Sequence, residues 1–309
     1  MGASPQGDML FEARPAAHVV FFNGLDDPGL QARGGWTFST GLALLATVRM
    51  TNEPSTPIRT PSYEPRLRLQ VFRLSAPRVS GDRATRLLGA LELAAAHYSN
   101  GQKGCALADH LRGSGFSDFD CIPQTDPPST ELNVLDGSFT TNYLGASLAG
   151  RWTSLPAAGG PATWTASATA GLEWHVPCRF AGCMDPPMRA RYGEVVTRWS
   201  VEVDRLLVRG RAWRFPLVGP VPVDARLRAT AMGRLHFSSA SGRFGDVALE
   251  TALVQRYPGG FGVGPFVRLH RGRDDLNIRF EERLDAWIFG IVVDPVPPEV
   301  LPPPESSRG

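Results

Sequence analysis

Apolar and polar residues alternate with a period of two through most of this chain, which limits the folds open to it. In residues 36–50 the apolar residues share one face of an extended chain: Trp36, Phe38, Leu42, Leu44, Ala46, Val48 and Met50. Residues 163–175 and 193–203 repeat the pattern. Successive side chains of a β-strand point to opposite faces, so the alternation predicts strands with one apolar and one polar face. We therefore expect an all-β protein.

The alternating stretches predict twelve antiparallel strands, in the ranges 14–24, 35–50, 64–75, 88–99, 138–152, 163–176, 192–204, 206–216, 224–238, 244–257, 262–271 and 276–292. An even number of strands lets an antiparallel sheet close into a barrel. We expect a single barrel over residues 1–293. The Pro-rich tail 294–309 is predicted to be disordered.

A soluble β-sandwich also alternates, so other features have to separate it from a transmembrane barrel. Several predicted strands have about ten residues or more, which suits a tilted crossing of a bilayer better than a globular sheet. The polar face carries Arg66 and Arg68, which a polar lumen tolerates and where Glu92 is a plausible partner. Tryptophans lie near predicted strand ends, as in an interfacial girdle: Trp36, Trp152, Trp164, Trp174 and Trp199. A transmembrane barrel is favoured.

Charge excludes one class of partner, because the net charge is +2 and no basic block is present. We expect no nucleic-acid partner. Residues 1–10 lack the basic start and apolar stretch of a signal peptide, so we expect a trimmed or misassigned start.

The four cysteines form two local pairs, Cys105 with Cys121 and Cys178 with Cys183. Neither pair has the spacing of a zinc site or a redox motif, so loop disulfides are expected, with four free thiols as the alternative. In an antiparallel barrel, the connections that follow even-numbered strands lie at one end. The long connections follow the second, fourth and sixth predicted strands, and the loop 100–137 is one of them. In an outer-membrane barrel that end faces outside.

The run HYSNG at residues 97–101 contains the candidate chemistry. His97 and Ser99 share the apolar face of their predicted strand, where polar residues are costly for structure alone. A serine nucleophile needs a base, and the base needs a third group that fixes its orientation. Asn142 lies on the apolar face of the next strand, level with His97, and its carbonyl can accept the imidazole N–H. The backbone N–H of Asn100 or Gly101 is the expected oxyanion donor.

HYSNG followed by an Asn on the next strand resembles the outer-membrane phospholipase A family. That family is a twelve-stranded outer-membrane barrel with a Ser–His–Asn triad on its outer wall, activated by calcium and dimerisation. The resemblance implies that Ser99 is the nucleophile, His97 the base and Asn142 the orienting amide. It further implies calcium ligands at Gln102 and Ser138, a homodimer, and hydrolysis of phospholipid acyl esters in the outer leaflet.

Two alternatives remain open. HxSN also resembles the outer-membrane lipid A deacylase family, which acts on lipopolysaccharide acyl chains and has a Glu as its third triad member. Glu131 is the acidic residue nearest in sequence to the predicted strand 138–152, but it lies in a predicted loop. The second alternative is a porin-like or structural barrel in which His97 and Ser99 merely sit at the interface.

Overall fold

The computed structural model describes residues 9–51, 58–102, 104–112, 121–127, 131–134, 137–177, 184, 186–215, 219–257, 261–274, 277–294 and 300–301. The prediction of an all-β protein is confirmed, with two short helices, α1 (Pro28–Arg33) and α2 (Pro186–Tyr192). The described residues also form two single-turn 3-10 helices, η1 (Gly24–Asp26) and η3 (Asn277–Arg279). Within the ranges above, no helix is long and apolar enough to cross a bilayer.

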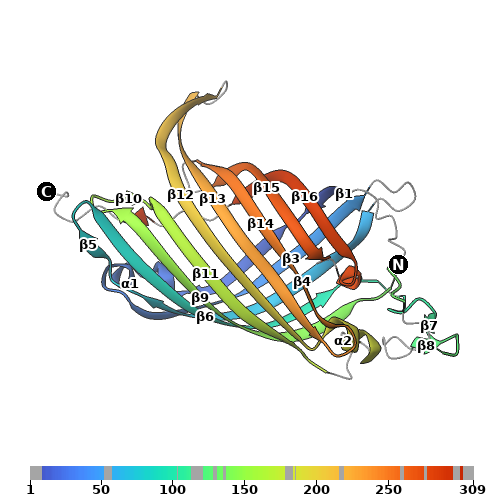
Figure 1. Cartoon of the computed structure of the whole chain (residues 1–309). Coiled ribbons are helices and arrows are strands. Elements are labelled where there is room, and N and C mark those ends of the chain that lie inside the picture. Colours follow the sequence, from blue (N-terminus) through green and yellow to red (C-terminus); the bar gives the residue numbers. More distant parts are fainter. Residues whose placement is uncertain are drawn as a thin grey trace.

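Thirteen strands form one antiparallel sheet (Figure 1). They are β1 (Met9–Ala13), β2 (Ala16–Asn23), β3 (Gly35–Thr51), β4 (Ile58–Leu74), β5 (Arg78–Ser80), β6 (Arg83–Ser99), β9 (Thr140–Pro156), β11 (Trp164–His175), β12 (Val195–Phe215), β13 (Gly219–Ser238), β14 (Gly242–Arg256), β15 (Gly262–Arg273) and β16 (Arg283–Asp294). Two small sheets pair β7 (His110–Arg112) with β8 (Cys121–Pro123), and β10 (Gly160–Pro161) with β17 (Val300–Leu301). Most strands are far longer than those of globular sheets, as expected.

The path across the large sheet contains eleven strands among the described residues, from β1 to β16. β1 and β2 both pair with β3 and together form one interrupted strand. The predicted strands 192–204 and 206–216 were wrong as separate elements, because they form the single strand β12. Two register shifts after Leu206 break the alternation there while pairing to β13 continues. The interruption of the alternation by β-bulges therefore led to the wrong prediction of a turn between two strands.

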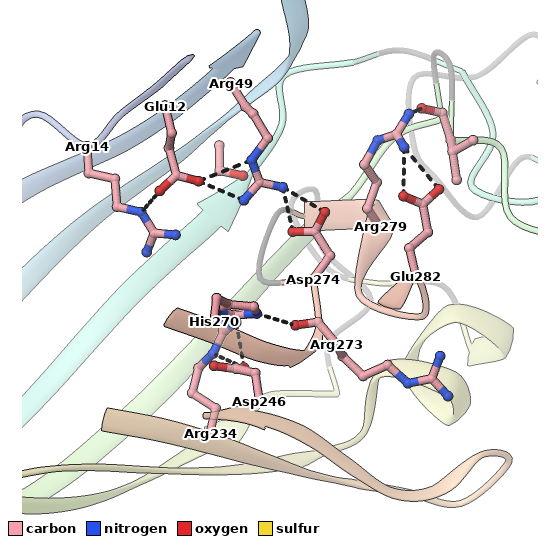
Figure 2. Close-up of polar contacts among 12 residues, drawn as sticks. Glu12, Arg14, Arg49, Arg234, Asp246, His270, Arg273, Asp274, Arg279 and Glu282 are labelled. Atoms are coloured by element: carbon pink, nitrogen blue, oxygen red, sulfur yellow. Dashed lines mark hydrogen bonds and ion pairs between the residues drawn. The ribbon is translucent and has the colours of Figure 1, made fainter. Parts of the chain in front are cut away.

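The sheet is rolled, so that its first and last strands approach each other across the interior. No backbone pairing joins β16 to β1 or β2 within the described segments. Buried side chains bridge this side instead: Arg49 on β3 donates to Asp274 at 2.7 Å and to Glu12 on β1 at 2.7 Å (Figure 2). Arg268 on β15 lies 3.8 Å from Glu12. Ion pairs thus tie the two margins of the sheet together.

The two faces of the sheet have opposite character. Large apolar side chains on the outer face are exposed, and Leu148 and Phe289 expose 65% and 75% of their surface. The five tryptophans expected in the girdle are all among the exposed residues. The inner face carries charges that are paired, as predicted for Arg68, whose Nε donates to Glu92 at 2.8 Å. Polarity is therefore inverted relative to a soluble protein.

The long connections gather at one end of the sheet, as strand parity predicted. β7, β8 and α2 lie at this end, and β5 and β10 lie at the other (Figure 1). Within the tail expected to be disordered, residues 300–301 form β17 and pair with 160–161. Residues 295–299 and 302–309 lie outside the described segments.

Replacing Arg49 with Met should strongly destabilise the fold. The side chains of Arg49, Glu12 and Asp274 each expose 4% of their surface, so the variant removes a buried cation that two buried carboxylates share. We expect the free energy of unfolding, measured by urea titration in micelles, to fall by about 3–5 kcal/mol.

The matched control is Arg283→Ala, which removes an ion pair to Asp285 in which both side chains are exposed. It should leave the urea midpoint unchanged. Equal midpoints for the parent and Arg49→Met would refute the ion-pair bridge.

Candidate active site

Pairing between β6 and β9 brings the candidate residues together. The two strands are in continuous register from Arg83 opposite Pro156 to Ser99 opposite Thr140. In that register His97 lies directly opposite Asn142. Residues forty-five positions apart in sequence thus become cross-strand neighbours, as the sequence predicted.

The His97 ring bonds the Asn142 side chain, with 2.9 Å between Nδ1 and Oδ1. An amide oxygen only accepts, so this contact requires the proton on Nδ1 and leaves Nε2 with a free lone pair. Both residues are half-buried and lie on the outer face, which also carries the exposed Leu93 and Leu144. A histidine whose neutral ring has a fixed tautomer therefore lies on the apolar wall.

Ser99 shares this outer face with His97, two residues further along β6 and at its last position. Ser99 is half-buried, and it pairs with Thr140 on β9 and with the exposed Tyr63 on β4. In the described part of the chain, no hydrogen bond links Ser99 to His97. Catalytic hydrogen bonds of this kind often tighten on substrate binding.

The two expected oxyanion donors differ in the structure. The Asn100 N–H donates to the Phe139 carbonyl at 2.9 Å, so it is already used and is not a free donor. Gly101 follows with a φ of 68°, in the left-handed region that favours glycine. Its N–H meets no acceptor among the described residues. Of the two, Gly101 remains as the candidate.

The expected calcium ligands flank the start and end of the long loop. The Gln102 N–H donates to the Asn100 side chain at 3.2 Å, and the Ser138 N–H donates to the Gly104 carbonyl at 2.8 Å. Both residues offer neutral oxygens. Calcium takes six to eight oxygens, among them carboxylates, carbonyls and waters, and the described residues contain no group of three His, Cys, Asp or Glu able to hold a metal. Calcium at Gln102 and Ser138 stays a prediction from the resemblance, and we derive no step through a metal.

The first predicted disulfide is present in the long loop. Cys105 and Cys121 are bonded, with 5.8 Å between their Cα atoms. Cys178 and Cys183, the second predicted pair, lie outside the described residues. A loop disulfide is typical of an oxidising compartment.

An aromatic plug, which sequence reasoning missed, fills the inside of the sheet beneath the site. It comprises Tyr98, Phe139, Tyr143, Met184, Met188, Tyr192, Val196, Ile278 and Phe280, with Ala96 and Ala106. Phe139 is completely buried and packs edge-on against Tyr98 and Tyr192, with ring centroids 5.2 and 5.1 Å apart. Burial raises the pKa of Tyr192, so its phenol stays neutral. The members come from distant strands and loops, and no local sequence signal joins them.

Behind the plug the interior contains a cavity of about 500 Å³. Its wall carries ion pairs such as Arg198 with Glu173 at 2.8 Å and Arg234 with Asp246 at 2.9 Å. Figure 2 shows the Arg234 pair next to His270, whose Nε2 bonds the Arg273 carbonyl at 3.1 Å. The cavity wall is polar, and its arginines form ion pairs with carboxylates of the wall or of neighbouring positions.

No family model matches the chain, and neither does any curated protein. Among solved structures, it is similar to outer membrane phospholipase A from Escherichia coli, with 13% identity over 92% of this chain and 77% of that chain and a TM-score of 0.44. An active-site mutant of the same protein has 14% identity, the same coverages and a TM-score of 0.41. The calcium-bound dimer of the Salmonella typhi outer membrane phospholipase has 14% identity over 92% and 78% of the chains and a TM-score of 0.43. These structures come from the family that HYSNG resembles.

The tautomer of His97 is directly measurable. We expect the ¹⁵N shifts of labelled His97, in the neutral ring, to report a proton on Nδ1, because Asn142 Oδ1 accepts from it. In Asn142→Leu this preference should disappear. A neutral ring protonated on Nε2 in the parent would contradict the arrangement.

Proposed function

We propose that this protein is an outer-membrane β-barrel that hydrolyses acyl esters of phospholipids. Ser99 is the nucleophile, His97 the general base and Asn142 the orienting amide. The single observation that carries the proposal is the 2.9 Å bond between His97 Nδ1 and Asn142 Oδ1 on the outer face. Such a tautomer-fixing contact beside a serine is the arrangement that activates a hydroxyl group.

The membrane location is supported by the distribution of apolar and charged side chains. The outer face is a belt of exposed apolar residues with tryptophans toward both strand ends, and the inner face is charged and ion-paired. In water such a belt would drive aggregation, whereas lipid covers it. A loop disulfide on the same end as His97 agrees with an end that faces outside the cell.

The reaction follows from the orientation of the base. A phospholipid in the outer leaflet approaches sideways, so that its ester carbonyl reaches the outer wall. His97 Nε2 takes the proton of the Ser99 hydroxyl as Oγ attacks the carbonyl carbon, and Asn142 stabilises the resulting imidazolium. The tetrahedral intermediate then collapses, and His97 returns the proton to the leaving alcohol. Water attacks the acyl-Ser99 ester by the same route and releases the fatty acid.

The oxyanion of the tetrahedral intermediate needs a donor that is not already in use. The Gly101 N–H, two residues after the nucleophile, meets this condition, whereas the Asn100 N–H is bonded to Phe139. Donors aimed at the developing charge usually provide a large share of the rate enhancement. We assign this role to Gly101.

The alternatives are less well supported. A lipid A deacylase arrangement would need Glu131 as the orienting group, but His97 bonds Asn142, and Glu131 lies in the loop, where its carbonyl accepts from Ala108. A passive pore needs an open lumen, and the aromatic plug fills the loop end of the interior. Dimerisation stays a prediction from the resemblance.

Ser99→Ala should abolish hydrolysis of a phospholipid presented in mixed micelles. Loss of a nucleophile typically lowers kcat by roughly 10⁵-fold or more, since no oxygen remains to form the acyl-enzyme. The rate would be followed by titration of released fatty acid, with and without added calcium.

The matched control for Ser99→Ala is Ser147→Ala, on the cavity side of β9. It should keep the parent rate. Retained activity in Ser99→Ala, or an inactive parent under both calcium conditions, would refute the esterase.

Asn142→Ala should lower kcat while the protein remains folded, because the imidazole loses its fixed tautomer. Removal of the orienting group in serine hydrolases costs on the order of 10²–10⁴-fold. The control is Thr140→Ala, which lies two residues away on the same strand and opposite Ser99. Parent-like kcat in Asn142→Ala would show that this amide does not orient the base.

A further inference from the structure

Asn100 occupies the point where β6 leaves the sheet. Residue pairing between β6 and β9 ends at Ser99 opposite Thr140, and a single backbone bond follows it, from the Asn100 N–H to the Phe139 carbonyl at 2.9 Å. Asn100 nevertheless exposes 2% of its surface, and its side chain points inward, away from the outer wall. A buried amide at this point has to be satisfied by local partners.

The Asn100 side chain joins the two ends of the long loop, residues 100–102 and residues 137–139, which we call its two arms. Its Nδ2 donates to the Gly137 carbonyl at 2.8 Å, and its Oδ1 accepts from the Phe139 N–H at 2.9 Å. The same Oδ1 accepts from the Gln102 N–H at 3.2 Å, which closes a turn around Gly101. With the backbone bond to the Phe139 carbonyl, Asn100 ties Gly101 to the 137–139 arm.

The 137–139 arm is itself immobilised. Phe139 is completely buried in the aromatic plug. At Gly137 a Cβ would lie 2.3 Å from the Asn133 carbonyl oxygen and 2.7 Å from Ile278, so the backbone packs too closely for any other residue. Contacts therefore run from the plug through Phe139 and Asn100 to the turn that carries the Gly101 N–H.

We propose that the Asn100 side chain is a positioning residue that holds the Gly101 N–H in place beside Ser99. The inference rests on the proposed esterase function. It explains why an amide is needed, since one group must donate to a carbonyl and accept from two N–H groups at once. Asp in its ionised form would keep the acceptors but repel the Gly137 carbonyl, and Ala would leave all three backbone groups without this partner.

The test compares Asn100→Ala and Asn100→Asp with the parent in the micellar phospholipid assay. A misplaced oxyanion donor should lower kcat of Asn100→Ala on the order of 10²-fold, with KM unchanged because the outer wall is intact. Asn100→Asp should lie between the parent and Asn100→Ala. The shape of the pH profile of kcat/KM should stay that of the parent, because His97 and Asn142 are untouched.

The matched control is Asn133→Ala, which removes another loop amide that bonds a backbone carbonyl, that of Cys105 at 3.2 Å. It should keep the parent kcat, and thermal unfolding in micelles establishes that each variant is folded. Folded Asn100→Ala with parent kcat overturns the inference. If Asn100→Ala does not fold, Asn100→Asp decides: lowered kcat at unchanged KM supports the inference, and parent kcat overturns it. An inactive parent refutes the proposed function itself, whereas an active parent with unaffected Asn100 variants refutes only the positioning role.

Discussion

Hydrogen bonding between long antiparallel strands is the interaction on which the rest of this structure depends. It fixes the register of each strand against its neighbours, and a slip of one residue would move every side chain to the other face. The pairing of β6 with β9 thereby sets His97 opposite Asn142 on the outer wall. The candidate site is thus a consequence of sheet register, made from two strands that are adjacent in the sheet order.

Once the apolar faces point outward, the interior has to accept the polar ones. Charged side chains in such a space are stable only when they are paired, because an isolated buried charge is costly. The structure meets this requirement with ion pairs on successive strands, such as Arg68 with Glu92 and Arg268 with Glu250. The same chemistry bridges the margins of the sheet through Arg49. Polar pairing inside and apolar exposure outside are therefore two sides of one constraint.

The loop end of the interior follows a different rule. There the aromatic plug packs as a conventional core, and it anchors the 137–139 arm of the long loop. Asn100 is hydrogen-bonded to this arm, and it thereby connects the arm to the turn at Gly101, next to the last residue of β6. The candidate site at the rim of the sheet thereby gains support from below, although its side chains face outward. The proposed function therefore separates the residues assigned to the chemistry from those assigned to holding the donor in position.

The sequence by itself determined the all-β class, the two-faced strands, the lumen pairing of Arg68 with Glu92 and the facing of His97 and Asn142. These follow from a period of two and from adjacency along the chain, which are local properties. Only the tertiary structure decided the length of β12, because bulges after Leu206 interrupt the alternation without ending the strand. It also decided the plug, the bridge through Arg49 and the side-chain role of Asn100, whose backbone N–H the sequence had suggested as an oxyanion donor. These contacts join residues far apart in the chain, and their partners are set by how the sheet rolls rather than by any neighbouring residue.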